Sequence, residues 1–423
     1  MPQTQHLLAL PRLPGLDQHF GRKVNVMAGP LAGIRVVDLT RVLAGPLCTM
    51  LLADQGAEVI KVETLDGDSV RGPVTGSGFS PMFVSANRGK RTLALDLKHP
   101  EGHGALLRLL ATTDVLVENF RPGTMQRLKL GEPELRKQFP RLIYASITGV
   151  GDSGPYVRKR VYDPIIQALS GIADVQSDAG TGRPRLVRTV MADKTTAVYA
   201  AQAICASLFA RERSGEGEHI RVAMLDTMIG FIWPESMTQH TVIGQEQTAL
   251  DPNARPDLVY KTLDGYITVG TNSNSEWHGL CRVLSRPDWV DDPRFRTGAA
   301  RSVNATQRIT LVGELLATQT SEHWLPLFDE AEVPCAPVLR RQDVANNEQV
   351  RHNEIITEFD QPLVGRVRQP RPAARFDHRP AVIAGPARRL GEDTQAILRT
   401  LGYTDEQIDK LEQDGAVMRS KPA

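Results

Sequence analysis

The chain has 423 residues and a mass of 46.5 kDa, which is too long for a single compact core, so two domains are expected. Lysine and arginine number 50 against 49 acidic residues, which gives a net charge of +1. This balance leaves no broad basic surface for a polyanion and argues against nucleic acid as the main partner. The sequence contains no run of about 18 apolar residues, which argues against a membrane-spanning helix and against a membrane as partner.

The cysteines and the first residues bear on the compartment. Four cysteines lie far apart, with no CxxC pair and no cysteine–histidine cluster: Cys48, Cys205, Cys281 and Cys335. We therefore expect buried free thiols, no metal site and a reducing, cytoplasmic environment. Residues 1–26 lack the apolar core of a secretory signal and form an N-terminal arm. Because this arm contains little acid and a few basic residues, a mitochondrial transit peptide, and so a matrix location, is the alternative.

The first half of the chain has the pattern of alternating strands and helices. It begins with a strand, a helix and a second strand, at 34–40 (IRVVDLT), 47–53 and 58–63 (EVIKVE). Three more strands and a helix follow, at 92–97, 114–119, 142–148 and 100–112. This alternation predicts a doubly wound α/β domain with a parallel sheet. Ligands of such sheets bind beyond the carboxyl ends of the strands, here the segments 40–45, 118–123 and 148–154.

The loop after the first strand, TRVLAGP, is not a glycine-rich nucleotide loop. It lacks GxGxxG, so the usual nicotinamide or flavin fingerprint is absent. The helix start at Gly45–Pro46 could still present backbone N–H groups to a phosphate, although a plain turn explains these two residues equally well.

The second half of the chain predicts a smaller α/β insertion. A strand at 218–223 and a helix at about 226–239 are followed by a polar stretch, 244–256, typical of a linker. Residues 258–270 have the pattern of a hairpin that turns at Asp264–Gly265. The remaining predicted elements are helices near 275–284, 305–318 and 322–331, a strand at 337–339, polar proline-rich segments at 361–392 and a helix at 404–413.

Asp193 stands ahead of a long helical pattern, VMADKTTAVYAAQAICASLFARERSG. Apolar residues recur at three- and four-residue steps along one face: Val198, Ala201, Ile204, Cys205 and Leu208. On these residues alone, Asp193 is best explained as an N-cap whose carboxylate accepts hydrogen bonds from the first free N–H groups. The alternative is a nucleophilic carboxylate aimed into a cleft.

Seven segments carry a resemblance to a known family: GIRVVDLTRVLAGPLCTMLLADQGAEVIKVE, NRGKRTLALDLKHPEG, DVLVENFRPGTMQRL, LIYASITGVGDSGP, YDPIIQALSG, ADKTTAVYAA and ERSGEGEHIRVAMLD. In this order they resemble the class III CoA-transferases, a family that includes formyl-CoA transferase, carnitine CoA-transferase and the α-methylacyl-CoA racemases. The resemblance covers most of residues 31–226, and weaker matches extend it nearly to the end of the chain.

The resemblance implies a large Rossmann-like domain built from both chain ends, with a smaller inserted α/β domain. It also implies a homodimer whose two chains are interlocked like rings. Combined with the predicted elements, it gives an N-terminal arm (1–26), a first part of the large domain (27–225), a linker (226–256), the small domain (257–340), and a return linker with the C-terminal part of the large domain (341–423).

The resemblance further implies transfer of CoA from an acyl-CoA donor to a carboxylic acid through an aspartyl-CoA thioester on Asp193. A carboxylate suits this role because acylating it gives an anhydride about as activated as the donor thioester. Backbone N–H groups near Gly149, Gly151 and Gly154 could stabilise the tetrahedral oxyanions. Acyl-CoA is then a substrate, and neither a permanently bound cofactor nor a metal is expected.

By resemblance, ten residues would contact CoA: Leu43, Ala44, Leu95, Lys98, Asn119, Phe120, Arg121, Arg127, Arg160 and Tyr162. The basic ones suit the anionic phosphates, although each is equally consistent with a solvated surface charge. The chain departs from the family at Thr64, where an arginine normally follows the second strand, so that phosphate contact must come from elsewhere or be absent. It also lacks the polyglycine loop of formyl-CoA transferase, which suggests a different acceptor.

Two other functions compete with transfer. The racemases of this family carry a GHD motif, which here is Val161–Tyr162–Asp163, and tyrosine side chains ionise near pH 10 and are poor bases at neutral pH. Asp163 then either holds the Tyr162 loop or, as we prefer, caps a helix. The third possibility is a non-catalytic module that binds CoA esters. Arg41, in TRVLAGP, resembles the loop of succinyl-CoA-dependent dicarboxylate CoA-transferases, which suggests succinyl-CoA as donor. The cluster Arg158, Lys159 and Arg160 could help bind a second carboxylate, although a solvated surface charge explains it equally well.

Overall fold

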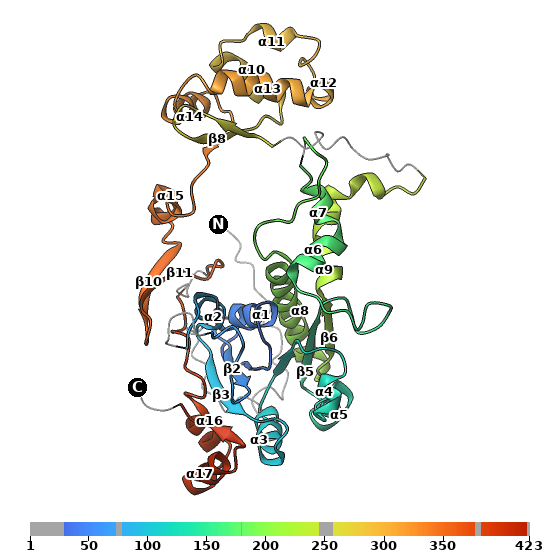
Figure 1. The fold of residues 1–423 in the computed structure, drawn as a ribbon, viewed down its shortest axis with the longest axis vertical. Helices are drawn as coiled ribbons and strands as arrows, with labels where there is room; N and C mark the ends of the chain where they lie inside the picture. Colours follow the sequence, from blue (N-terminus) through green and yellow to red (C-terminus); the bar gives the residue numbers. More distant parts are fainter. Residues whose placement is uncertain (1–28, 73–77, 179, 245–256, 377–381, 421–423) are drawn as a thin grey trace, which may run out of the picture. The chain divides into compact units, whose positions relative to one another are not determined.

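The computed structural model describes residues 29–72, 78–178, 180–244, 257–376 and 382–420. The N-terminal arm and most of the predicted linker at 244–256 lie outside these residues. The chain divides into two compact units. Unit 1 consists of Met1–Arg158, Thr196–Ala223 and Glu358–Ala423, and unit 2 of Lys159–Thr195 and Met224–Thr357 (Figure 1). The domain boundaries given above stay a prediction.

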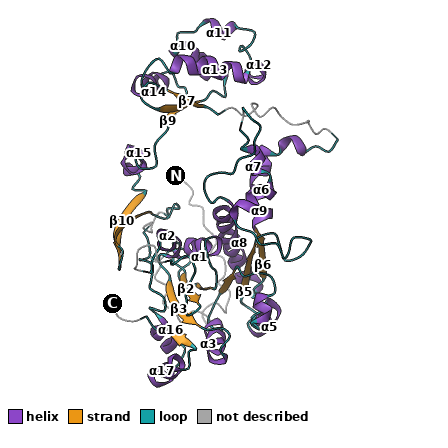
Figure 2. Cartoon of the chain, viewed as in Figure 1, coloured by secondary structure: helices purple, strands orange, loops and turns teal. Residues whose placement is uncertain are grey.

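Unit 1 contains a seven-stranded sheet with the order β12-β3-β2-β1-β4-β5-β6 (Figure 2). The six strands from β3 to β6 run parallel, and only β12 is antiparallel. The order 3-2-1-4-5-6 is that of dinucleotide-binding sheets, and the large parallel sheet confirms the predicted α/β class. The strands are β1 (Arg35–Asp38), β2 (Glu58–Glu63), β3 (Arg91–Leu95), β4 (Val115–Glu118), β5 (Ile143–Thr148), β6 (His219–Ala223) and β12 (Val417–Met418).

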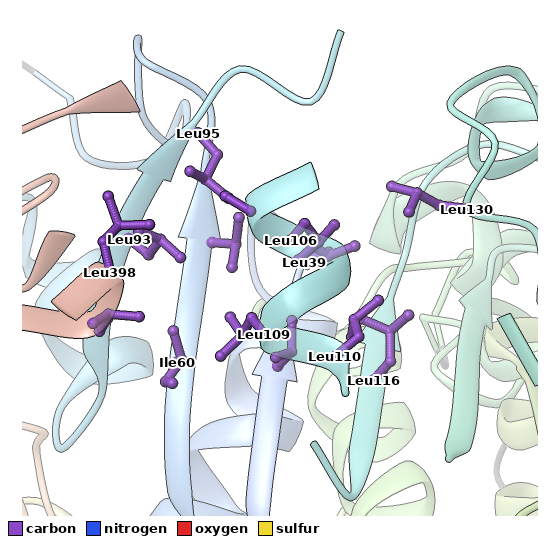
Figure 3. Packing of buried hydrophobic residues seen from close by; sticks show 14 of the residues in the cluster. Leu39, Ile60, Leu93, Leu95, Leu106, Leu109, Leu110, Leu116, Leu130 and Leu398 are labelled. Carbon is purple, nitrogen blue, oxygen red and sulfur yellow. The ribbon is translucent and has the colours of Figure 1, made fainter. Parts of the chain in front are cut away.

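Alternate strand residues face two separate cores. In β1, Val37 packs in one core with leucines of α3, whereas Val36 packs in the other with residues of α1 and α8. Figure 3 shows Leu106, Leu109 and Leu110 of α3 in the first core. This two-residue period follows from the pleat of a strand, and it explains why the central strands carry apolar residues on both faces. The helices of this part of the chain are α1 (Ala44–Ala53), α2 (Pro81–Asn87), α3 (Pro100–Leu110), α4 (Thr124–Arg127), α5 (Glu132–Gln138) and α8 (Ala192–Ser214).

The buried face of α8 differs from the predicted one. Ala201, Ile204 and Leu208 are buried as expected, but Val198 is 56% exposed. Ala197 lies in the core instead of Val198. Counted from Ala197, the buried residues are spaced at i, i+4, i+7 and i+11, which is the spacing of one helix face.

The C-terminal segment of unit 1 holds structure that the sequence pattern missed. Its polar stretch contains strand β11. Glu358, on the preceding strand, forms ion pairs with Arg366 and Arg368 of β11 at 3.2 and 2.8 Å. Charged pairs across the hairpin therefore replace the apolar alternation that predicts strands. Leu398 of a further helix packs into the α3 core (Figure 3). The elements are β10 (Ile356–Gln361), β11 (Gly365–Pro370), α16 (Thr394–Thr400) and α17 (Asp405–Gln413), of which α17 was predicted.

Unit 2 contains an antiparallel sheet of three strands, β7 (Val259–Lys261), β8 (Tyr266–Val269) and β9 (Cys335–Pro337). The first two form the predicted hairpin, and β9 begins two residues before the predicted strand. A core rich in aromatic residues, including Trp277, Trp289 and Phe328, packs with this sheet. The helices are α6 (Asp163–Ser170), α7 (Ile172–Val175), α9 (Met224–Ser236), α10 (Asn274–Val283), α11 (Asp288–Asp291), α12 (Gly298–Val303), α13 (Ala305–Leu316), α14 (Ser321–Glu330) and α15 (Glu348–His352).

Candidate active site

The order of the parallel strands reverses between β1 and β4, which is where sheets of this kind bind ligands. The loops that follow these two strands are joined by the side chain of Asn119. Its Oδ1 accepts a hydrogen bond from the Arg41 N–H at 2.9 Å, and its Nδ2 donates to the Arg41 carbonyl oxygen at 2.9 Å. The Asn119 amide, predicted to contact CoA, is therefore engaged in fixing the Arg41 backbone.

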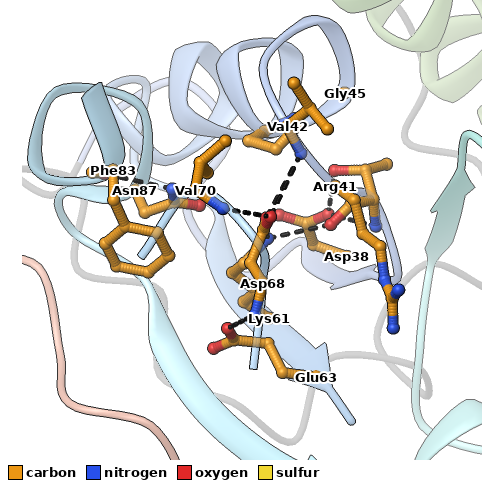
Figure 4. A network of polar contacts seen from close by, with 12 residues as sticks. Asp38, Arg41, Val42, Gly45, Lys61, Glu63, Asp68, Val70, Phe83 and Asn87 are labelled. Atoms are coloured by element: carbon orange, nitrogen blue, oxygen red, sulfur yellow. Dashed lines mark hydrogen bonds and ion pairs between the residues drawn. The ribbon is translucent and has the colours of Figure 1, made fainter. Parts of the chain in front are cut away.

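The next residue, Val42, is held in an unfavourable conformation. Its φ of 68° lies in the left-handed region, which β-branched residues rarely adopt. Its N–H lies 3.3 Å from both carboxylate oxygens of Asp68 (Figure 4). Asp68 forms a buried ion pair with Lys61 at 3.2 Å, and the Lys61 ammonium donates to the Thr40 carbonyl oxygen at 2.8 Å. The loop after β1 is thus fixed on both sides of Arg41.

A second buried ion pair lies beneath the start of α1. The Asp38 carboxylate accepts hydrogen bonds from the Thr40 N–H at 2.8 Å, the Thr49 hydroxyl at 2.7 Å and the Lys90 ammonium at 2.9 Å. Lys90 also donates to the Pro46 carbonyl oxygen at 2.8 Å. These contacts connect β1, α1 and the segment before β3, so they fix where the helix begins relative to the sheet.

Burial and charge act in opposite directions on this pair. Burial alone would raise the pKa of Asp38, but the charges of Lys90 and Lys61 and the hydrogen bonds from Thr40 and Thr49 lower this pKa well below its usual range. Burial lowers the pKa of Lys90 to about 8, although the Asp38 charge opposes the shift. Both groups are therefore charged at neutral pH.

These buried charges were not predicted from the sequence. Their signal was present, because Asp38 and Lys61 are charged residues within the apolar strand patterns IRVVDLT and EVIKVE. A charge inside a strand that is otherwise apolar indicates either an exposed edge or a buried ion pair.

The other predicted CoA-contacting residues of unit 1 follow the carboxyl ends of parallel strands. After β1, Leu43 is the N-cap residue of α1 and Ala44 is the buried first residue of that helix. At the end of β3, Leu95 has no exposed surface, whereas Lys98 is exposed in a turn that Asp96 closes by accepting from the Lys98 N–H at 2.9 Å. The Leu95 side chain is therefore inaccessible to a ligand and can only pack beneath the surface that binds one.

Three further predicted residues follow β4. Phe120 is half-buried, and its ring centroid lies 5.7 Å from the guanidinium carbon of Arg41. Arg121 is exposed, and the exposed Arg127 donates to the Thr124 hydroxyl at 2.9 Å. Because the carboxyl ends of parallel strands meet at one edge of a sheet, these residues share an edge with those after β1 and β3.

Unit 1 contains a cavity of about 790 Å³, which was not predicted from the sequence. Its size is ordinary for a small-molecule site. Apolar side chains and arginines line it together: Asp66, Arg71, Gly78, Phe79, Arg389, Leu390, Glu412, Met418, Arg419 and Ser420. The arginines are paired with acids, Arg71 with Glu63 at 2.7 Å and Arg419 with Glu412 at 2.5 Å, so their charges are largely compensated.

Asp193 lies in unit 2, in the first turn of α8. The helix begins at Ala192, so Asp193 is its second residue, and the prediction that it is the N-cap is wrong. The Asp163 carboxylate fills that role, because its Oδ2 accepts from the N–H groups of Ala192 at 2.6 Å and Asp193 at 3.3 Å. Asp193 is half-buried, and a carboxylate in this turn is favoured by the helix dipole.

Asp163 itself is the buried first residue of α6, not its N-cap, which is Tyr162. The Gln167 amide donates to Asp163 Oδ1 at 2.5 Å, and Gln167 Oε1 accepts from the Val187 N–H at 2.9 Å. The prediction that Asp163 is the N-cap of its own helix is therefore wrong, because its carboxylate accepts from the first N–H groups of α8 instead. One carboxylate and one amide on α6 set where α8 begins.

The remaining predicted site residues are exposed or engaged. Arg160 and Tyr162 are exposed, and Tyr162 is 68% accessible. Of the three glycines proposed to stabilise oxyanions, Gly151 donates its N–H to the Thr148 hydroxyl at 3.1 Å. The roles assigned to all of these residues stay predictions.

A membrane-spanning helix and a cluster of metal-binding side chains are both absent from the residues that the structure describes. Within them, no helix is both long and apolar enough to cross a membrane. Over the same ranges, no three histidine, cysteine, aspartate or glutamate side chains are grouped so as to hold a metal ion.

The parallel sheet, with its loops fixed at the strand-order reversal, defines an α/β protein with a ligand-binding edge. The sequence profile of CoA-transferase family III matches residues 31–394, and the chain belongs to this family. It is a CoA-transferase, with acyl-CoA as substrate.

Relatives with assigned activities agree with this family. The chain is 35% identical over 396 residues to succinyl-CoA:glutarate CoA-transferase of Mus musculus, covering 92% of this chain and 90% of the relative. It is 38% identical over 350 residues to succinyl-CoA:mesaconate CoA-transferase of Haloarcula hispanica, covering 79% and 86%.

Solved structures agree in fold. The crystal structure of Rv3272 from Mycobacterium tuberculosis matches with a TM-score of 0.78 and 31% identity, covering 88% of this chain and 99% of that one. A CaiB/BaiF family protein from Brucella suis matches with a TM-score of 0.77 and 31% identity, covering 88% and 100%.

We predict that Asp38→Asn lowers the free energy of unfolding by about 3–5 kcal/mol at neutral pH, because it leaves the buried ammonium of Lys90 without its counter-charge. The folded-state pKa of Asp38 lies below its ordinary value of 3.8, so the stabilisation is fully present above that value and is lost progressively as the pH falls from it through the folded-state pKa. The deficit of the variant should therefore shrink below about pH 4. Urea unfolding at neutral pH and at about pH 3 measures both effects.

The matched control is Asp405→Asn, which removes an exposed ion pair with Arg399 and should leave stability nearly unchanged at both pH values. An Asp38→Asn variant as stable as the wild type at neutral pH contradicts the prediction.

Proposed function

We propose that the protein transfers CoA from succinyl-CoA to a dicarboxylic acid through a thioester on Asp193. The observation that carries the catalytic part is the position of Asp193 in the first turn of α8, where Asp163 already accepts from the first two N–H groups. Capping therefore does not require the Asp193 carboxylate. The substrate part is supported by relatives named for glutarate and mesaconate, both of which use succinyl-CoA.

In the proposed course, an Asp193 oxygen attacks the thioester carbonyl of succinyl-CoA and the CoA thiolate leaves, giving a mixed anhydride. The thiolate then attacks the aspartyl carbonyl, which releases succinate and forms the aspartyl-CoA thioester. The acceptor carboxylate attacks this thioester and expels the thiolate, giving a second anhydride. Attack of the thiolate on the acceptor's acyl carbon yields the new acyl-CoA and regenerates the Asp193 carboxylate, with no net proton released.

Asp193→Asn is expected to lower the rate of CoA transfer by several orders of magnitude and to retain the fold, because an amide cannot act as the carboxylate nucleophile. With the wild type, mass spectrometry after incubation with succinyl-CoA should find CoA on the peptide containing Asp193, and hydroxylamine should remove it. The matched control is Asp226→Asn, the same change in the first turn of α9, which should keep its activity. An Asp193→Asn variant that turns over normally would rule out the mechanism.

The substrate assignment predicts higher turnover with succinyl-CoA than with acetyl-CoA, and higher turnover with five-carbon dicarboxylates than with monocarboxylates of equal length. The measurement is a mass-spectrometric screen of acyl-CoA products over a panel of donor and acceptor acids. Preference for a monocarboxylate pair contradicts the assignment. Rapid washout of the α-deuterium of a 2-methylacyl-CoA without an acceptor would instead indicate a racemase.

We also propose that the active protein is a homodimer. Two helices carry large apolar side chains that are exposed in the single chain, Val198, Tyr199 and Phe209 on α8 and Phe231 and Trp233 on α9. Exposed apolar groups of this kind are typical of protein interfaces. Light scattering should give about twice the chain mass of 46.5 kDa. A stable, active monomer at micromolar concentration refutes the dimer.

A further inference from the structure

Arg41 presents an uncompensated charge in a part of unit 1 where the buried charges of Asp38, Lys61, Glu63 and Arg71 are paired. Its Nη2 donates to the Thr64 hydroxyl at 3.3 Å, and its guanidinium lies 5.7 Å from the Phe120 ring centroid. Among the described residues, no carboxylate lies within ion-pair distance of it. By contrast, the guanidinium groups of Arg71 and Arg88 are buried against carboxylates at 2.7 and 2.6 Å.

The nearby acids do not compensate this charge. Glu63, at the end of β2, pairs with Arg71, and Asp68 pairs with Lys61. Figure 4 shows the Arg41 side chain extending away from the carboxylates of this network. Glu118 is buried and accepts from the Phe120 N–H at 2.8 Å, and burial raises the pKa of its carboxyl. The guanidinium therefore keeps a net positive charge available to a ligand.

The backbone that carries Arg41 is fixed before any ligand arrives. The Asn119 amide bonds both its N–H and its carbonyl, and the carbonyl of the residue before it accepts from Lys61. The residue after it, Val42, has a φ of 68°. Backbone strain of this kind persists where surrounding contacts impose it, and it clusters at ligand sites. Less entropy is then lost when the side chain binds an anion.

The position of the guanidinium matches the ligand-binding edge of the sheet. Arg41 follows β1, Thr64 follows β2 and Phe120 follows β4, so the side chain spans the carboxyl ends of three neighbouring parallel strands. The strand order reverses between two of these strands. Arginine suits a phosphate there because its planar fork can donate two parallel hydrogen bonds.

We propose that Arg41 binds a phosphate group of CoA and so supplies, from the loop after β1, the cation that is missing at Thr64. The Thr64 hydroxyl, which lies 3.5 Å from the Gly67 carbonyl oxygen, orients the guanidinium as an acceptor. The assignment rests on CoA as the substrate of the proposed function, and it is independent of the role of Asp193.

The test compares the binding of three probes to the wild type and to Arg41→Gln by titration calorimetry: CoA, dephospho-CoA and pantetheine. Removing a charged hydrogen-bond partner should weaken CoA binding by about 10- to 100-fold. Pantetheine carries no phosphate, so its affinity should not change. If dephospho-CoA shows the same loss as CoA, the contact is to the pyrophosphate; if it shows none, the contact is to the 3′-phosphate.

The matched control is Arg282→Gln, which removes an exposed arginine of α10 and should leave the affinity for all three probes unchanged. Thr64→Arg on the Arg41→Gln background should restore CoA affinity, because it returns a guanidinium to the same edge. Unchanged CoA affinity in Arg41→Gln overturns the proposal, as does an equal loss for pantetheine. A wild type that fails to bind CoA would instead refute the substrate itself, so the two failures are distinguishable.

Discussion

Buried charge beneath the loop after β1 is the constraint on which the ligand-binding edge depends. Asp38 and Lys61 have no exposed surface, and Lys90 is 1% exposed. Removing such ions from water costs several kcal/mol each, so they are tolerated only with near-complete pairing. Here Lys61 binds the Asp68 carboxylate and the Thr40 carbonyl oxygen, and Lys90 binds the Asp38 carboxylate, Asn87 Oδ1 and the carbonyl oxygen of Pro46 in the first turn of α1. The same bonds that compensate the buried charges therefore fix both ends of the loop that carries Arg41.

A second carboxylate of this kind operates at α8. The first N–H groups of a helix need acceptors, and the usual solution is an N-cap side chain from the same helix. In this protein Asp163, on α6, accepts from the first two N–H groups of α8. It is 4% exposed, and the Gln167 amide holds its other oxygen. Because α8 is capped from outside, its start does not depend on the acid in its own first turn.

The sequence predicted the strands and helices that depend on a local pattern of residues. It missed the contacts that pair residues far apart in the chain. Runs rich in apolar residues, such as IRVVDLT, located the parallel strands, because a strand buried on both faces carries apolar side chains on both. That pattern carried no signal for the pairing of Lys61 with Asp68. Val198 fits the apolar spacing of α8, yet it is exposed, because spacing alone does not determine which of two overlapping faces meets the sheet. The Asp163 cap joins residues about 30 positions apart, which no local signal reveals.

The strained residue next to Arg41 indicates why position 42 is not a glycine. A glycine at position 42 would adopt a φ of 68° without penalty, but it would also leave the loop free to take other conformations. Valine in this conformation costs on the order of 1–3 kcal/mol, which the hydrogen bonds to Asp68 and from the Asn119 amide must offset. Once they do, the β-branched residue restricts the alternatives open to the loop. The backbone of Arg41 is then held in one conformation by contacts within the chain.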